Sequence, residues 1–199
     1  MKTRINYITD AWTRIKNHCR TTVNKKFTEK EPTKKFKQQL VISEHSPLRC
    51  LEIDWTWEEM EYWVSTEWSR HKFEKFITSQ RDDRNQNEIP RRDKPQGALV
   101  TYDGYANAQN IIDAWRKRLC FMATKEARGY ALDFKNTLHE QEPELADALV
   151  PNCIYRAGCP EFSSCGFWDK FLKNHPDINL LNIVERYNAY NEDLKNERV

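Results

Sequence analysis

Two short clusters of basic and hydroxyl side chains follow one another in the middle of the chain. Residues 70–72 read Arg-His-Lys, and residues 79–81 read Ser-Gln-Arg. Arginine offers paired, fixed donors to a phosphate, lysine a point charge and serine a further hydrogen bond. The clusters therefore indicate a site for a phosphorylated ligand. The alternative is a surface helix whose last basic residues only complement the helix dipole.

A second set of polar side chains recurs at helical spacing further along the chain. Asn107, Asn110 and Asp113 fall on adjoining turns, and Arg118 lies three turns after Asn107, close to the same face. Amides and an arginine on one stripe can bind the edge of a base or of a flavin. A solvated helix face explains the same composition, so both interpretations stay open.

The elements that must position these residues follow from hydrophobic periodicity. Apolar residues three to four apart predict helices over residues 9–23, with Asp10 as N-cap, 58–71, 106–141, with a break near Thr124, and 179–194. Alternation predicts a strand over 49–57 and a short one over 98–102, whereas 24–39 and 82–97 are expected to be connections. This pattern is α+β: one strongly helical domain over residues 1–199 with a small sheet and a cysteine-bearing extension from about residue 150.

Composition excludes several classes of protein. The 199 residues are 39% apolar and 31% charged, which is too apolar for a disordered tail and too short for two full-sized domains. A formal charge of +2 argues against a protein whose main task is to bind nucleic acid. Neither a long apolar run nor the apolar core of a secretory signal is found, so we expect no membrane partner and a cytoplasmic location.

Four segments, taken in order, resemble the motifs of the flavin-dependent thymidylate synthase family. Residues 107–128 resemble N-x-R-x-x-x-(N/H)-x-x-x-x-R-x-x-x-x-A-Q-x-E-I-R, with matches at Asn107, Arg118, Glu126 and Arg128. Residues 70–81 resemble R-H-R-x(n)-S-x-R, residues 44–48 (EHSPL) resemble H-x-S-P-(L/F)-E-H, and residues 19–22 (CRTT) resemble A-R-x-(S/T). Four motifs in the family's order over residues 19–128 are far more specific than any one of them.

The chain also departs from the family pattern. Arg49-Cys50 stands where the family has Glu-His, Lys72 and Gln109 replace arginines, and Ile77 replaces a glutamate. These departures fall on flavin and folate contacts more than on nucleotide contacts. They indicate a divergent branch of the family, such as one encoded by a phage and acting in the cytoplasm of a bacterium or of an infected host.

The resemblance implies a fold, an activity and an assembly. Members of the family pack a small antiparallel sheet with long helices and form homotetramers whose active sites are shared between subunits. They bind FAD, reduce it with NADPH and methylate dUMP at C5, with methylenetetrahydrofolate as the carbon donor. The reduced flavin supplies hydride and no enzyme nucleophile is needed, which agrees with the lack of a nucleophile-base pattern around any cysteine.

The resemblance also implies a role for individual residues. Arg118 is expected to be the catalytic residue, because a fixed cation at the uracil edge stabilises the enolate-like charge that grows as C5 is activated. The expected dUMP-binding residues are Glu67, Arg70, Ser79, Gln80, Arg81, Arg91 and Arg118. The expected FAD-binding residues are Thr22, Ser46, Arg70, His71, Lys72, Asn107, Gln109 and Asp113. For Glu126 and Arg128, a ligand role and an internal helix pair are both open.

Three cysteines near the C-terminus lie outside these motifs. Cys153, Cys159 and Cys165 are separated by five residues each, unlike the two-residue knuckles of structural zinc sites, so a zinc site needs a distant fourth ligand such as His139 or His175. We therefore expect free thiols and no metal.

Two other functions compete with thymidylate synthesis. One is a related enzyme that adds a different one-carbon group, such as a hydroxymethyl, to a pyrimidine nucleotide, because the changes at Arg49-Cys50 and Ile77 could alter binding of the carbon donor. The other is an inactive nucleotide-binding or interaction protein of the same fold.

Overall fold

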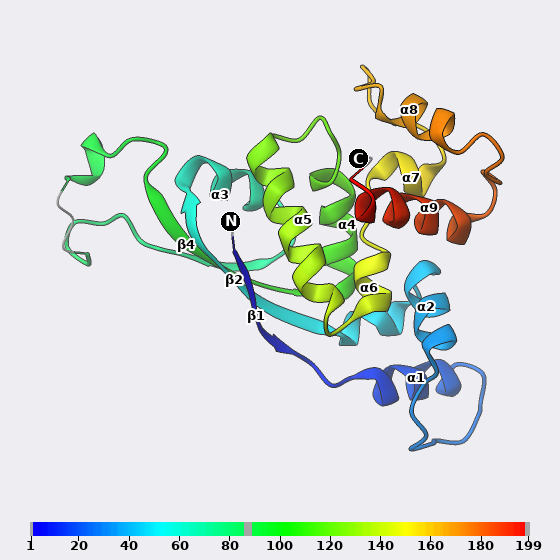
Figure 1. The fold of residues 1–199 in the computed structure, drawn as a ribbon. Helices are drawn as coiled ribbons and strands as arrows, with labels where there is room; N and C mark the ends of the chain where they lie inside the picture. Colours follow the sequence, from blue (N-terminus) through cyan, green and yellow to red (C-terminus); the bar gives the residue numbers. More distant parts are fainter. Residues whose placement is uncertain (1, 86–88, 198–199) are drawn as a thin grey trace.

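The computed structural model describes residues 2–85 and 89–197, which are built around a four-stranded antiparallel sheet (Figure 1). In spatial order its strands are β1 (Thr3–Ile8), β2 (Glu52–Glu61), β4 (Leu99–Asn107) and β3 (Glu74–Ile77). Buried residues alternate with more exposed ones along β4, as expected when helices cover only one face of a sheet. The sheet therefore has an inner, aromatic face and an outer, polar face.

The β2 strand is longer than its sequence pattern predicted. The expected change to helix at Glu58 is wrong, because β2 continues to Glu61 and helix α3 covers only Tyr62–Trp68. The register against β4 shifts between Trp57 and Met60, and Glu59 has a φ of 55°. This bulge inserts an extra residue and returns Met60 to the buried face, which makes the spacing look helical in the sequence.

A glycine in β4 makes room for a large side chain in β2. Gly104 pairs with Trp55, and a methyl group on Gly104 would overlap the indole ring of Trp55. Trp55 is fully buried and packs edge-on against Trp57, Phe73, Trp115 and Phe134. The aromatic core therefore depends on a missing side chain at one position of the sheet.

Helices α3, α4 (Ala108–Arg118) and α5 (Lys125–His139) lie against the inner face of the sheet (Figure 1). Trp68 of α3 contacts Trp57 with ring centroids 4.7 Å apart, and Trp115 of α4 contacts Phe134 of α5 at 4.3 Å. Such large rings bury much apolar surface per residue. The core thereby fixes the end of α3 and the face of α4, which carry the predicted site residues.

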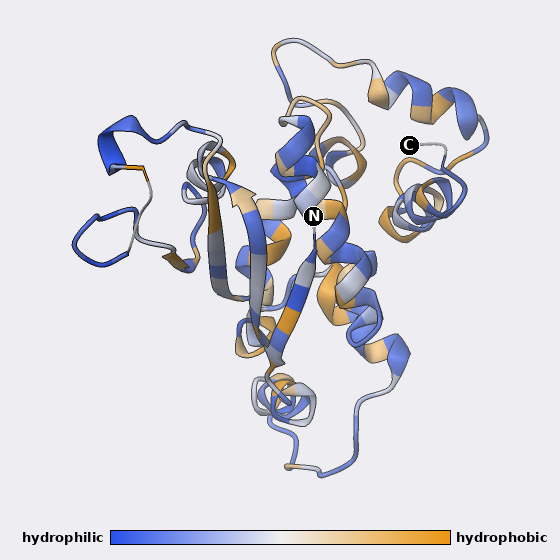
Figure 2. Cartoon of the chain, turned by 60° about the vertical axis from the view of Figure 1, so that its left-hand side comes forward, coloured by the Kyte–Doolittle hydropathy of each residue, from blue (hydrophilic) through white to orange (hydrophobic). Residues whose placement is uncertain are grey.

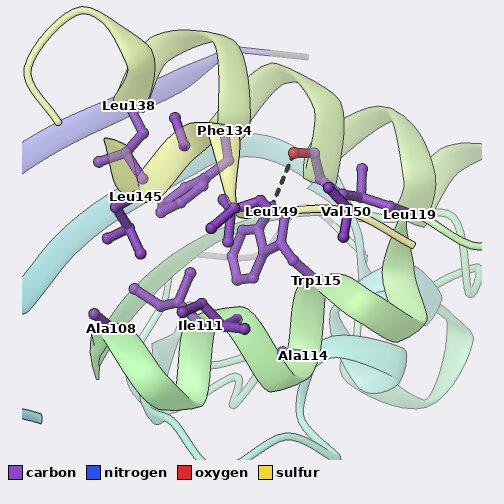
Figure 3. Close-up of a cluster of buried hydrophobic side chains, with 14 of the residues drawn as sticks. Ala108, Ile111, Ala114, Trp115, Leu119, Phe134, Leu138, Leu145, Leu149 and Val150 are labelled. Atoms are coloured by element: carbon purple, nitrogen blue, oxygen red, sulfur yellow. Dashed lines mark hydrogen bonds between the residues drawn. The ribbon is translucent and has the colours of Figure 1, made fainter. Parts of the chain in front are cut away.

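On the side of α4 away from the sheet, a second part of the core joins α4, α5 and α6 (Pro143–Asp147) (Figure 3). The indole nitrogen of Trp115 donates to the carbonyl of Ala131 at 2.9 Å, the bond drawn in Figure 3. A partner of this kind stabilises a buried indole N–H. This bond locks α4 against α5.

The helix predicted over 106–141, with a break near Thr124, is instead a strand end and two helices. Asn107 ends β4 and caps α4, since its side-chain oxygen accepts from the backbone of Asn110 at 3.0 Å. The break near Thr124 is confirmed, because the hydroxyl of Thr124 accepts from the backbone of Ala127 and caps α5. The short strand predicted over 98–102 extends to Asn107 and lies in the interior of the sheet.

The remaining helices surround this centre. α1 (Trp12–Thr21) confirms the first predicted helix, although its N-cap is Ala11 and not Asp10. The connection expected over 24–39 is wrong in its last part, where α2 (Lys34–Ile42) begins after a Thr33 cap. The other elements are the 3-10 turns η1 (Ser46–Cys50) and η2 (Arg91–Asp93) and the helices α7 (Asn152–Arg156), α8 (Phe167–Asn174) and α9 (Ile183–Lys195).

Hydrophobic residues gather where the sheet meets the helices, whereas the described part of the connection between β3 and β4 is mostly hydrophilic and extends away from the helices (Figure 2). At the opposite end of the molecule, α7 packs on α4 and α9. Across residues 2–85 and 89–197, every helix is too short or too polar to cross a membrane.

Candidate functional site

A hydrogen-bonded cluster around Arg118 joins two of the predicted motifs. The Nη1 of Arg118 lies 3.0 Å from the carboxylate of Glu67, its Nη2 donates to the carbonyl of Glu67 at 2.6 Å, and its Nε donates to Nε2 of His71 at 2.7 Å. The hydroxyl of Thr124 also donates to the Glu67 carboxylate at 3.2 Å. The guanidinium is therefore held in one orientation by groups on α3 and on the turn after it.

The charges of this cluster follow from its burial. The Arg118 and Glu67 side chains are only 14% and 21% exposed, so their ion pair is largely shielded from water. Burial, together with the neighbouring Arg118 cation, lowers the pKa of His71 to about 4. Because Nε of Arg118 can only donate, His71 must accept through an unprotonated nitrogen. The cluster at neutral pH thus holds a charged arginine against a neutral imidazole.

A cavity of about 340 Å³ lies beside this cluster, between α4, α7 and the turn after α3. We call it the basic cavity. It is lined by Arg70, His71, Lys72, Asn110, Asp113, Ala114, Arg116, Lys117, Asn152, Tyr155 and Arg156. Four residues expected to bind FAD therefore border one cavity, together with three residues of α7 that no motif contains.

Asn110 ties the two motifs that meet at the basic cavity. Its side-chain amide donates to the carbonyl of Lys72 at 2.9 Å, while its backbone is capped by Asn107. This contact holds the turn at residues 70–72 against the first turn of α4. Asn107 itself uses its side-chain oxygen as the helix cap, which gives this matched residue a structural task in addition to the predicted flavin contact.

Glu44 is the centre of a second polar network, which borders the basic cavity through Arg116 and Asp113. It accepts from Nε2 of Gln109 at 2.6 Å and forms a close ion pair with the buried guanidinium of Arg116. Burial by itself would lower the pKa of Arg116, but the hydrogen bond and charge of Glu44 raise it. Arg116 also stacks on Tyr155, with its Cζ 3.5 Å from the ring centroid. Gln109 therefore lies in a network with carboxylates, where the family pattern has an arginine.

The residues expected to hold the dUMP phosphate gather in a separate cleft. Ser79, Gln80, Arg81 and Arg91 line a cavity of about 310 Å³ together with Tyr62, Ile77 and Thr78. The Arg81 guanidinium pairs with Asp83 at 2.6 Å, and the Ser79 hydroxyl accepts from the backbone of Arg81 at 3.3 Å. In the described chain, this phosphate cleft shares no lining residue with the basic cavity.

The two remaining predicted FAD residues lie in a third place. Thr22 and Ser46 line an apolar groove of about 280 Å³ between α1, α2 and η1, together with Cys19, Val23, Phe36, Leu40, His45 and Pro47. Most of the predicted ligand residues thus line three cavities or belong to the Arg118 cluster, and Arg118 lines none of these three cavities.

Glu126 and Arg128, the last matched residues, are not paired with each other. Arg128 lies over the ring of Phe121, 3.9 Å from the centroid, and Glu126 is exposed in the first turn of α5. The carboxylate of Glu126 lies near the N-terminus of the helix, where the dipole favours a negative charge. These positions favour a structural role for both residues.

The cysteines are free thiols. Burial raises the pKa of Cys153 to about 12, and the charges of Cys120 and Cys159 act on it from nearby, so Cys120 joins the C-terminal cysteines in space. Within residues 2–85 and 89–197, histidine, cysteine and carboxylate side chains form no group of three that could hold a metal ion.

Several residues of these sites were not predicted from the sequence. Glu44 stands in the EHSPL motif without an assigned role. Arg116 and Lys117 precede Arg118 in α4, and their positions on that helix were the only available signal. Asn152, Tyr155 and Arg156 belong to a five-residue helix in the cysteine-bearing segment, where no periodicity could place them beside α4.

Neither a protein-family model nor a curated protein sequence matches the chain. Its structure is similar to that of flavin-dependent thymidylate synthase from Helicobacter pylori complexed with FAD and dUMP, with a TM-score of 0.60 and 16% identity over 75% of this chain and 100% of that one. A second structure of the Helicobacter pylori enzyme with FAD and dUMP gives a TM-score of 0.59 at 16% identity, covering 75% and 99% of the two chains. The resemblance seen in the motifs is thus confirmed by the architecture: this chain has the fold of the flavin-dependent thymidylate synthases.

Proposed function

We propose that this protein is a cytoplasmic FAD-dependent thymidylate synthase that methylates dUMP to dTMP, with methylenetetrahydrofolate as carbon donor and NADPH as reductant. The observation that carries the proposal is the contact of Arg118 with both Glu67 and His71. It joins the two motifs of highest specificity through His71 and Arg118, which are 47 positions apart in the chain. The same fold in an enzyme that binds FAD and dUMP supports this assignment.

The residues of the basic cavity suit the negatively charged FAD. Arg70, Lys72 and Lys117 line the cavity and form no ion pair with any described carboxylate. When bound and reduced, the flavin would supply hydride to the pyrimidine. His71, neutral at physiological pH, would present a flat ring to the flavin, and Asn107, Gln109 and Asp113 would orient it from α4. The groove with Thr22 and Ser46 would receive a further part of the cofactor.

Arg118 would act on dUMP through charge. Its guanidinium stays protonated even where burial lowers its pKa, since an arginine is not deprotonated in proteins. Glu67 and His71 hold it in place before substrate arrives, so little reorganisation is needed when charge grows on the uracil. Ser79, Gln80, Arg81 and Arg91 would bind the phosphate and sugar, and Arg70 would contribute from the neighbouring turn.

The separation of the phosphate cleft from the basic cavity supports a shared active site. A reaction between a bound flavin and a bound nucleotide needs both sets of residues at one site. In the described chain these two sets line different cavities. We therefore propose a homotetramer in which the cleft of one copy meets the basic cavity of another.

Absorbance and product analysis test the function. The purified protein is expected to bind FAD with a flavin absorbance band and to convert dUMP to dTMP when methylenetetrahydrofolate and NADPH are present. A hydroxymethylated product would instead identify a related pyrimidine modifier. A protein that binds dUMP but cannot be reconstituted with FAD would be an inactive relative, and the proposal would be wrong.

A further inference from the structure

Four cations at the basic cavity have no acidic partner among the described residues. Arg70, Lys72, Lys117 and Arg156 line the cavity, and none of them forms an ion pair within residues 2–85 and 89–197. The fifth cation, Arg116, is neutralised by Glu44. Like charges gathered around a cavity repel one another and are stabilised by an anionic ligand. The cavity therefore suits a ligand with more than one negative charge.

Arg156 is the cation that lines the basic cavity from α7, whereas Arg70 and Lys72 line it from the turn after α3. It is the last residue of α7, and its Nε donates to the side-chain oxygen of Asn152 at 3.1 Å. A guanidinium has five N–H groups, so this bond orients the side chain and leaves the four N–H groups of Nη1 and Nη2 for a ligand. Such a fork matches the oxygens of a phosphate.

Although α7 is short, its position is fixed by two arginines from other helices. The buried Arg186 of α9 donates to the carbonyls of Ile154 and Tyr155 at 2.8 and 2.9 Å. Arg116 of α4 lies flat on the ring of Tyr155. The chain then turns away through Ala157, whose φ of 55° is left-handed, so that α7 ends at Arg156. Arg156 is therefore presented to the cavity by a rigid support.

We propose that Arg156 is a further ligand-binding residue of this protein and binds the diphosphate of the nucleotide cofactor, together with Arg70 and Lys72 of the basic cavity. The inference rests on the proposed function, in which this cavity receives FAD. It adds a wall that lies outside the motifs shared with the family, since α7 follows the last matched residue, Arg128, by more than twenty positions. A diphosphate carries more than one negative charge and therefore suits a cavity whose unpaired cations come from two elements.

Binding of FAD, ADP and riboflavin to the full-length protein tests the inference. Riboflavin has the same ring system without phosphate, and ADP has the diphosphate without the flavin. Arg156→Ala is expected to weaken FAD and ADP binding about tenfold or more, the effect of a lost charge-assisted hydrogen bond, and to leave riboflavin affinity unchanged. The FAD and ADP affinities of Arg156→Lys should lie between those of the wild type and of Arg156→Ala, because lysine keeps the charge but lacks the paired N–H donors of a guanidinium.

Lys173→Ala is the matched control, because it removes one positive charge from the last turn of another helix, α8, away from the cavity. It should change none of the three affinities. If Arg156→Ala binds FAD as the wild type does, or weakens riboflavin as much as FAD, the inference is wrong while the proposed function stands. If the wild type binds ADP but not FAD, and Arg156→Ala loses ADP, the diphosphate site is supported and the proposed function fails. If the wild type binds neither, both are wrong.

Discussion

Arg118 of α4 donates a hydrogen bond from Nε to Nε2 of His71, with the two nitrogens 2.7 Å apart. The bond requires a neutral imidazole, and burial, together with the neighbouring Arg118 cation, lowers the pKa of His71 to about 4. His71 thus fixes the direction of the guanidinium, and the charge of Arg118 adds to the burial that keeps the ring unprotonated. The pair links the turn after α3 to the end of α4, where two of the motifs meet.

Replacement of Arg118 by alanine should abolish deoxynucleotide methylation while flavin stays bound. Loss of a preorganised charge at the developing enolate is expected to reduce kcat by about 100- to 1000-fold. The readouts are dTMP formed per bound flavin and the flavin absorbance of the purified variant. Arg128→Ala, which removes an arginine that lies over Phe121, serves as the comparison and should keep most of the turnover. Loss of flavin with unchanged turnover per bound flavin would contradict the assignment.

The low pKa of His71 predicts that stability falls as the pH falls from about 6.5 towards 4. Over this interval the unfolded chain binds a proton at His71 that the folded chain does not, so protonation favours unfolding. With allowance for the partial exposure of the ring, the free energy of unfolding should fall by about 2 kcal/mol over this interval. It is measured as the shift in urea midpoint between pH 7 and pH 4.5.

His71→Gln provides the control for this pH dependence. Glutamine can accept the bond from Nε of Arg118 but does not titrate, so the variant should lose part of the pH dependence and retain stability at pH 7. If the wild type and His71→Gln show the same dependence between pH 7 and pH 4.5, another group is responsible.

The sequence predicted those parts of the fold in which one pattern dominates over a full element. α1 and α9 follow a clear helical stripe, and Thr124 is a strong cap signal, so these predictions were confirmed apart from their ends. The edge strands β1 and β3 were missed, because β1 has only a weak alternation and β3 is four residues long. Their pairing depends on distant partners in β2 and β4, which local periodicity does not contain.

The site was predicted in its motifs but not in its grouping. Residues 70–72 and Asp113 do lie around one cavity, and Ser79, Gln80, Arg81 and Arg91 around another. No spacing rule could show that Glu44 pairs with Arg116 or that α7 completes the cavity, because these contacts join segments 72 and about 40 residues apart. The roles of these residues in binding stay predictions.

A methyl group at position 104 should destabilise the whole sheet. In Gly104→Ala, the added atom meets the ring of Trp55, which is packed on all sides and cannot move without disturbing its neighbours. Overpacking of this kind costs about 1–3 kcal/mol or more. The free energy of unfolding from urea titration, followed by tryptophan fluorescence, measures the effect.

Gly158→Ala is the matched control for this substitution. A Cβ at Gly158 meets nothing within 4 Å, so the variant should unfold close to the wild-type midpoint. Equal stability of Gly104→Ala and Gly158→Ala would show that Trp55 has room to shift.

Lys135 is a buried amine, and its replacement by methionine should remove a pH dependence of stability above neutrality. Burial lowers the pKa of Lys135 to about 7, although the nearby Asp147 raises it. Between pH 7 and 8.5 the unfolded chain holds a proton on this lysine that the folded chain has partly lost, so wild-type stability should rise by about 1–2 kcal/mol as the pH rises. In Lys135→Met this rise should disappear, while stability at pH 7 should be equal or higher because no amine is desolvated.

Lys125→Met is the control, because Lys125 lies on the exposed first turn of the same helix; this variant should keep the wild-type dependence of stability on pH. Urea midpoints at the two pH values measure both variants, and a rise that persists in Lys135→Met would mean that another group causes it.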